Sequence, residues 1–318
     1  MIFKFEPLYF QRVWGGRTLE KIFRRQMPKE VAIGESWDLV DRKDFQSVLI
    51  SPQKSKITIR ELLKSNHPKI MGPGWDQNMR FPVLVKWLDC AERLSLQVHP
   101  PKELAGSLKG EPKTENWYVA HTWADSGLFV GLKLGTTKEN FLKALVDKKL
   151  ESVCHRIPSS AGDSILVESG RMHAIDGGNL ILEIQQNSDT TFRVYDWERV
   201  GTNGTPRELH IDESLKCIDF NDFEPTVTKS SATPIQILAE CDHFRIRKFK
   251  ANANEVISLK ASNEQCMIIN PINSDIKIRN IEVSKGELGL SPYEHECEVR
   301  FKESGDLIVT DNFHKPVT

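Results

Sequence analysis

Short apolar segments recur along the first two thirds of the chain, and each is bounded by Gly, Pro, Asp or Ser. They are rich in β-branched and aromatic residues. The clearest are FPVLVKWL (81–88), NWYVAHTW (116–123), SGLFVGLKL (126–134), DSILVESG (163–170), GNLILEIQQ (178–186) and TFRVYDW (191–197). Short strands separated by turn residues are typical of antiparallel sandwiches and barrels. The pattern therefore predicts a mainly β protein.

Two segments carry apolar residues at helical spacing. The first, at about 58–72, begins with Thr58 and has Glu61 three positions later, which is the pattern of a capping box. The second, at about 136–156, places its apolar residues on one helical face. No alternation of strand, glycine-rich turn and helix is present, which disfavours a dinucleotide-binding sheet. Both helices are expected as insertions that decorate a β core.

The composition changes near residues 220–234, where FNDFEPTVTKSSATP collects Pro, Ser, Thr and Asn. We place a domain boundary there, between a larger domain of residues 1–225 and a smaller β domain of residues 235–318. The second unit shows short strand-like segments with polar turns and no cluster of ligand-type residues. Its expected role is structural support.

The charged residues nearly cancel, since 43 Lys and Arg stand against 44 Asp and Glu and give a formal net charge of -1. This balance offers no field for a polyanion, so neither nucleic acid nor a membrane surface is expected as a partner. No apolar run approaches the roughly 20 residues of a membrane span. The six cysteines contain no C-x-x-C pair, which favours reduced thiols and a cytoplasmic protein. No heptad pattern is evident, and a monomer is expected.

Candidate metal ligands occur in three strand-like segments. In LSLQVHP, Gln97 and His99 are two positions apart and therefore point to the same face of a strand. Glu115 opens another apparent strand, and His173 follows a turn bracketed by glycines. Two imidazoles, a carboxylate and an amide oxygen suit Zn²⁺, although Mn²⁺, Fe²⁺, Co²⁺ or Ni²⁺ would also accept them. The residues by themselves leave the choice among these metal ions open.

The segment around His173 resembles the second motif of the cupin family. GDSILVESGRMH runs from Gly162 to His173, and in cupins this motif is a turn that delivers a histidine to the mouth of a barrel. The segment departs from the motif at Glu168, where cupins prefer Pro. It departs again in the distance from His99 to Glu115, which is 16 residues instead of a few.

The type I phosphomannose isomerases are cupins whose metal glutamate lies beyond an inserted loop, and they resemble the chain between residues 5 and 199. The resemblance is carried by FEPLYFQRVWGG, GESWDLV, FPVLVKWLDC, LSLQVHPPK, PKTENWYV, GRMHAI and LEIQQNSDTTFRVYDWER. It implies a cupin (jelly-roll-like) barrel with helical insertions over residues 1–225 and a smaller cupin-like β domain over residues 235–318. It also implies a sugar phosphate as the substrate and one zinc ion per chain, with the zinc ligands Gln97, His99, Glu115 and His173.

Members of this family interconvert mannose 6-phosphate and fructose 6-phosphate, which moves a proton between C2 and C1 through an enediol-like intermediate. Glu183 is the first candidate for the base, because alternation along NLILEIQQ lets it point into a barrel. Lys86 and Lys113 are the alternatives, since a buried lysine whose pKa is lowered can exchange protons. A structural role for Glu183, orienting Arg193 or a ligand histidine, is left open.

The resemblance places Arg193 beside the substrate, where a guanidinium would steady negative charge. It places Ser95 and Arg199 at the phosphate. Arg199 stands where the family often has lysine, which preserves the charge and permits two-pronged contact. The segment VGTNGTPREL (200–209) is predicted to be a plain turn, because no following helix would lend its amide dipole to a phosphate.

Two other functions are left open: a sugar-binding cupin without catalysis, and after it a metal-dependent oxygenase, since iron also accepts two histidines and one carboxylate. A cupin that only binds a sugar would have no chemical need for Glu183 and Arg193. An oxygenase would not explain the residues on the phosphate side. The predicted function is therefore a metal-dependent aldose–ketose isomerase.

Overall fold

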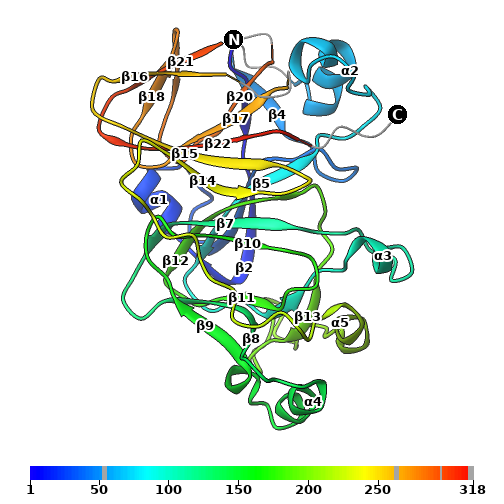
Figure 1. Cartoon of the computed structure of the whole chain (residues 1–318). Coiled ribbons are helices and arrows are strands. Elements are labelled where there is room, and N and C mark those ends of the chain that lie inside the picture. The colour runs from blue at the N-terminus through cyan, green and yellow to red at the C-terminus, as the bar shows by residue number, and fades with distance from the viewer. Residues whose placement is uncertain (52–55, 261–264, 294–295, 314–318) are drawn as a thin grey trace.

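A computed structural model describes residues 1–51, 56–260, 265–293 and 296–313 of the chain. The barrel lies at one end of the molecule in Figure 1 and the C-terminal strands lie at the other. Antiparallel sheets dominate, so the predicted mainly β fold is confirmed. No helix in the described part of the chain is long and apolar enough to cross a membrane. The six cysteines are free, as expected.

Two antiparallel sheets form the barrel. The first has the order β10-β7-β12-β5-β2-β3 and consists of β2 (Leu8–Gly16), β3 (Ile33–Leu39), β5 (Val83–Cys90), β7 (Glu115–Thr122), β10 (Ser164–Val167) and β12 (Asn179–Gln186). The second has the order β13-β6-β11-β8-β9 and consists of β6 (Leu96–Val98), β8 (Gly127–Leu132), β9 (Cys154–Pro158), β11 (His173–Ile175) and β13 (Phe192–Tyr195). Leu88 and Ile181 of the first sheet share one buried cluster with Val130 and Ile175 of the second. The predicted apolar segments are these strands.

The C-terminal part contains two further sheets. One has the order β14-β15-β22-β17-β20 and consists of β14 (Ile235–Glu240), β15 (Arg245–Ala251), β17 (Met267–Pro271), β20 (Gly289–Ser291) and β22 (Gly305–Asp311). The other has the order β16-β21-β18-β19 and consists of β16 (Val256–Leu259), β18 (Ile276–Ile278), β19 (Ile281–Val283) and β21 (Cys297–Phe301). A separate apolar cluster lies among these strands. The division at 225 and 235 stays a prediction, and residues 261–264, 294–295 and 314–318 lie outside the described residues.

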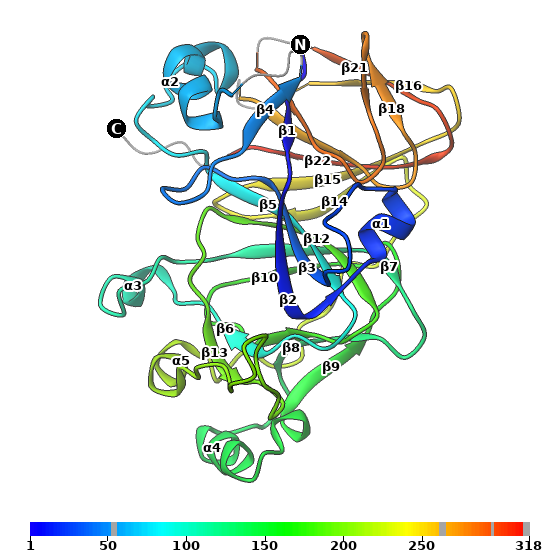
Figure 2. The same ribbon diagram turned by 180° about the vertical axis from the view of Figure 1, so that it is seen from behind.

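The N-terminus belongs spatially to the C-terminal part. Phe3 and Leu290 exchange backbone hydrogen bonds of 2.9 and 2.8 Å, and Ile2 is buried in the C-terminal apolar cluster. The next residues form β1 (Lys4–Glu6), which pairs with β4 (Val48–Ser51). Figure 2 shows these strands beside the C-terminal sheets. No local pattern predicted this pairing, because it joins residues almost 290 positions apart.

Strand β5 of the six-stranded sheet is buried on both faces. Every residue of β5 is buried, and side chains alternate between the faces. Lys86 therefore faces the barrel interior, while Val85 and Trp87 join a core that includes Ile246 and Ile268 of the C-terminal sheet. This second apolar layer leaves the interior face free to carry polar side chains.

The predicted helices form, with one shorter than expected. Residues 58–72 contain α2 (Ile59–Ile70), and Thr58 and Glu61 make the predicted capping box. Residues 136–156 contain α4 (Lys138–Val146), a 3-10 turn at Leu150–Ser152 and the start of β9. The helix ends early because Lys148 adopts a left-handed conformation with φ of 58°. Three short helices were not predicted: α1 (Thr18–Phe23), α3 (Lys102–Ala105) and α5 (Ile211–Cys217).

Candidate active site

Three fully buried side chains converge inside the barrel. His99 follows β6, Glu115 opens β7 and His173 opens β11, and none of the three is exposed to solvent. Their ligand atoms lie within 4.8 Å of one another. Gln97 is the strand partner of His173 in the β6–β11 pair and borders the cavity described below. The structure therefore brings the four predicted metal ligands into one region.

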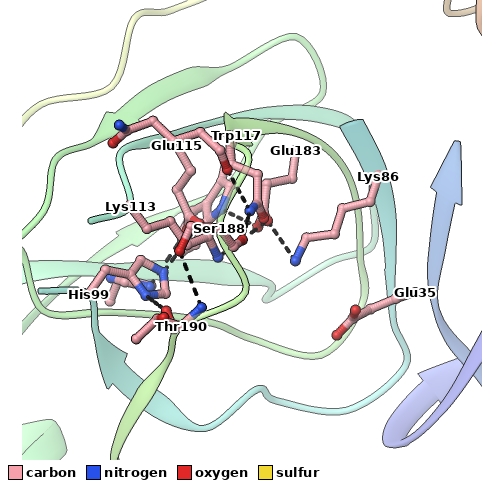
Figure 3. A network of polar contacts seen from close by, with 12 residues as sticks. Glu35, Lys86, His99, Lys113, Glu115, Trp117, Glu183, Ser188 and Thr190 are labelled. Atoms are coloured by element: carbon pink, nitrogen blue, oxygen red, sulfur yellow. Dashed lines mark hydrogen bonds and ion pairs between the residues drawn. The ribbon is translucent and has the colours of Figure 1, made fainter. Parts of the chain in front are cut away.

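Hydrogen bonds fix both imidazoles in the tautomer that a metal ligand requires. Nδ1 of His99 donates to the carbonyl of Thr190 at 2.9 Å, and Nδ1 of His173 donates to the carbonyl of Arg171 at 2.8 Å. Each Nε2 then carries a lone pair and makes no hydrogen bond. These atoms lie 3.2 and 3.6 Å from the Glu115 carboxylate, as Figure 3 shows for His99 and Glu115.

The protonation states of His99, His173 and Glu115 favour binding of a cation. Burial, with a further contribution from Lys113, lowers the pKa of His99 to about 3, and burial likewise lowers the pKa of His173. Burial alone would raise the pKa of Glu115, but the positive charge of the neighbouring Lys113 more than offsets burial and holds this pKa well below its usual range. Two neutral imidazoles facing a carboxylate bring electron-rich atoms together, and a divalent cation resolves this repulsion. The residues therefore fit a metal ion with nitrogen and oxygen ligands.

A second polar row crosses the same sheet face. Glu183 on β12 pairs in register with Lys86 on β5 and Trp117 on β7. Its carboxylate lies 2.8 Å from the Lys86 ammonium and accepts a 3.0 Å hydrogen bond from Nε1 of Trp117. The ammonium of Lys113 lies 3.7 Å from Glu183 and 2.7 Å from Glu115. Lys113 thus connects Glu183 with Glu115, one of the candidate metal ligands (Figure 3).

The charge state of Lys86 differs from the hypothesis that burial would make it a base. Burial alone would lower the pKa of Lys86, but the carboxylates of Glu183 and Glu35 raise it above its ordinary value. Lys86 therefore stays protonated. The pKa of Glu183 is raised, first by burial and then by the charge of Glu115. The polar contacts of the Glu183 side chain among the described residues are with Lys86, Lys113 and Trp117, and none is with Arg193 or a ligand histidine.

A cavity of about 560 Å³ opens in front of these groups. This volume falls within the range of about 300–1,000 Å³ that is common for small-molecule sites. The predicted residues Ser95, Gln97, Lys86, Lys113, Glu183 and Arg193 all border it. The three buried metal-ligand candidates do not line the cavity themselves, so a ligand in it would meet their ion from the side of Gln97 and Lys113.

Arg199 lies elsewhere. Its Nε and Nη2 donate to Asp196 at 3.0 and 2.9 Å, and it borders a separate depression beside Trp197 and Arg93. Arg199 is not among the residues that line the cavity in the described part of the chain. Its predicted place beside Ser95 at the phosphate is therefore not supported.

Several cavity residues were missed from the sequence. Arg12 and Glu35 form an ion pair of 2.9 Å at the cavity wall, and their positions inside QRVWGG and GESWDLV were the available signal. The turn at 200–209 also lines the cavity, through Gly201, Thr202, Asn203 and Arg207. The expectation that no helix follows this turn is wrong, because α5 begins at Ile211.

Comparisons with known proteins identify the family of the chain. The family model described as "Phosphomannose isomerase type I, catalytic domain" matches residues 2–121. Mannose-6-phosphate isomerase ManA of Bacillus subtilis (strain 168) is 32% identical over 299 residues, which are 91% of this chain and 92% of that protein. Probable mannose-6-phosphate isomerase GmuF of the same organism is 34% identical over 254 residues, which are 77% of this chain and 78% of that protein.

A solved structure extends the agreement to the whole fold. The crystal structure of the mannose 6-phosphate isomerase from Bacillus subtilis superposes with a TM-score of 0.84 at 28% identity. The match covers 97% of this chain and 99% of that one, and it confirms the predicted cupin fold. The chain therefore belongs to the type I mannose-6-phosphate isomerase family.

Proposed function

We propose that the chain interconverts mannose 6-phosphate and fructose 6-phosphate, with one zinc ion held by Gln97, His99, Glu115 and His173. The observation that carries this proposal is the pair of imidazole lone pairs facing a buried carboxylate behind a cavity. Nitrogen and oxygen ligands of this kind suit zinc. When bound, such an ion supplies a Lewis acid that stabilises negative charge developing on substrate oxygens.

Glu183 is the residue best placed to carry the proton between C2 and C1. Lys86 stays protonated, so it can hold the Glu183 carboxylate but cannot accept a proton. The raised pKa of Glu183 makes it a stronger base than an ordinary carboxylate. Trp117 fixes one carboxylate oxygen through its indole N–H. The ammonium of Lys113 lies between the carboxylates of Glu115 and Glu183 and offsets the repulsion between them.

Arg193 would meet negative charge on the substrate. It pairs in register with Gln97 on the neighbouring strand, which places it beside the proposed metal. Its Nη1 donates to the carbonyl of Glu208 at 2.6 Å, while its buried Nε has no hydrogen-bond partner. A guanidinium with an unused donor at a cavity wall suits an oxyanion.

The test is turnover of mannose 6-phosphate before chelation, after chelation and after zinc is restored, with elemental analysis in parallel. We expect activity to be lost and recovered with the metal. In D₂O the product should carry deuterium, because a base that exchanges with solvent moves the proton. A folded, metal-loaded protein without turnover would favour the sugar-binding cupin instead.

The assignment of the base has its own test. Glu183→Gln should retain the metal and lose about 10²–10⁴-fold in kcat, the usual contribution of general acid–base catalysis. Glu168→Gln is the matched control, because the Glu168 side chain is 63% exposed. Near-normal turnover by metal-loaded Glu183→Gln would remove Glu183 from the role.

We also propose that the protein is a cytoplasmic monomer with a domain boundary between residues 225 and 235. The free thiols support a reducing compartment, and the separate apolar cluster among the C-terminal strands supports a distinct unit. Light scattering would report the oligomeric state. Limited proteolysis should cut first within residues 226–234 if the boundary is correct.

A further inference from the structure

A hairpin outside the predicted site forms part of the cavity wall. Val200 and Pro206 make an isolated β-bridge, and the N–H of Gly201 donates to the carbonyl of Thr205 at 2.6 Å. The wall receives Gly201, Thr202 and Asn203 from the hairpin and Arg207 from its end. The proton-transfer chemistry described above uses none of these residues.

Arg207 is fixed by a buried carboxylate. Its Nε donates to Oδ2 of Asp196 at 2.6 Å, and its Nη2 donates to Oδ1 of the same group. Asp196 is only 5% exposed. Nη1 of Arg207 makes no hydrogen bond within the described residues. Arg207 is therefore a pre-positioned guanidinium with one nitrogen left for a ligand.

Several guanidinium groups lie near the carboxylate of Asp196. Arg199 and Arg207 both bind Asp196. Arg193 lines the same cavity as Arg207, and the charge of Arg207 adds to burial in lowering the pKa of Arg193. The three guanidinium groups of Arg193, Arg199 and Arg207 thus outnumber the two carboxylates that act on Arg193, those of Asp196 and Glu208. A phosphate monoester carries about −1.5 to −2 charges near neutral pH.

The hairpin tip adds unused backbone donors. Oδ1 of Asn203 accepts from the N–H and hydroxyl of Thr205 at 3.1 and 2.9 Å, which braces the tip. Neither the N–H of Thr202 nor that of Asn203 donates a hydrogen bond within the described residues. Backbone N–H groups gathered at a turn commonly bind anions.

We infer that the phosphate of the substrate binds between Arg207, Arg193 and the tip of the hairpin at residues 201–203. Arg207, and not Arg199, then supplies the second guanidinium of the phosphate site. The inference rests on the proposed function only for the identity of the sugar. Ser95, which borders the same cavity and is 4% exposed, can donate its hydroxyl to the same anion.

The test compares single arginine variants of the metal-loaded enzyme. Arg207→Gln should raise the KM for mannose 6-phosphate about 10- to 100-fold, the effect of losing a hydrogen bond between charged groups. It should weaken competitive inhibition by inorganic phosphate by a similar factor. Arg207→Lys should recover part of the lost affinity, because lysine restores the positive charge but cannot make the bidentate contact of a guanidinium. Metal content should stay close to that of the parent protein, and Arg199 should keep the Asp196 carboxylate paired.

Two further variants make the test specific. Arg156→Gln is the matched control, since Arg156 also binds a buried carboxylate, that of Asp176, at 2.7 Å but does not line the cavity. Arg199→Gln should raise KM less than Arg207→Gln. A larger effect of Arg199→Gln, or a KM for Arg207→Gln equal to that of Arg156→Gln, would overturn the inference.

Calorimetry with inorganic phosphate separates this inference from the proposed function. Chelated but folded parent protein should bind phosphate, and chelated Arg207→Gln should bind it at least tenfold more weakly. Parent protein without isomerase activity that still shows this difference would refute the proposed reaction and keep the phosphate site. Binding that requires the metal would place the anion on the metal and refute the site.

Discussion

Glu35 is an ionised carboxylate whose contribution to stability can be measured by changing the pH. Its oxygens accept from Nε and Nη2 of Arg12 at 2.9 and 3.1 Å, and Nε1 of Trp37 donates to it at 2.8 Å. Burial alone would raise the pKa of Glu35, but Lys86 and then Arg12 more than offset burial and lower it from 4.5 to about 2. The folded protein therefore binds a proton at this site less readily than the unfolded chain.

The size and sign of the effect follow from this shift. Each pKa unit is worth about 1.4 kcal/mol, so ionised Glu35 stabilises the fold by roughly 3 kcal/mol at neutral pH. Because the pKa is lowered on folding, this contribution is fully present above pH 4.5 and is lost as the pH falls toward 2. At pH 3 roughly half of it should remain. Glu35→Gln removes the charge with little change in shape.

Urea unfolding of chelated parent and Glu35→Gln proteins, followed by circular dichroism at pH 7, 5 and 3.5, measures this contribution. The variant should be less stable by roughly 3 kcal/mol at pH 7, and the gap should narrow below pH 4.5. Glu20→Gln, a change at an exposed ion pair with Arg17, should alter stability by less than about 1 kcal/mol. A gap between the parent and Glu35→Gln that is the same at pH 7 and pH 3.5 would refute the reasoning.

Three further changes test other parts of the structure. Thr58→Ala removes the capping box of α2 and should cost about 1 kcal/mol in urea unfolding; no loss would mean that the cap is not formed in solution. Trp117→Phe removes the hydrogen bond to Glu183 and should lower kcat about 10- to 100-fold at unchanged metal content; unchanged kcat would show that the indole does not position the carboxylate. Ile268→Ala opens a cavity in the core between the barrel and the C-terminal sheet and should cost about 2–5 kcal/mol; a cost below 1 kcal/mol would mean that this core is loosely packed.

Local patterns in the sequence were sufficient for much of the fold and of the metal group. The strands around Lys86, Glu115 and Glu183 were predicted because turn residues bound short apolar runs. The rule that alternate residues share a strand face correctly placed Glu183 inside the barrel. Thr58 was recognised as a helix cap because its partner Glu61 is only three residues away.

Properties set by distant residues could not be predicted in the same way. The protonation of Lys86 depends on Glu35 and Glu183, which come from two other strands. The role of Arg207 depends on Asp196 and on how the hairpin folds over the cavity. A charged residue after a Gly- and Pro-rich turn looks like any exposed loop residue. The pairing of Phe3 with Leu290 leaves no periodic trace in the sequence at all.

The strands that hold Lys86 and Glu183 also separate the barrel from the C-terminal sheets, and this limits how either part can change in evolution. On β12, Glu183 faces the substrate cavity, while its neighbours Leu182 and Ile184 face the C-terminal core. A change of volume in that core is transmitted through one backbone to the position of the carboxylate. Replacing the C-terminal sheets with those of a relative would therefore also require compensating changes in the core residues of β5 and β12.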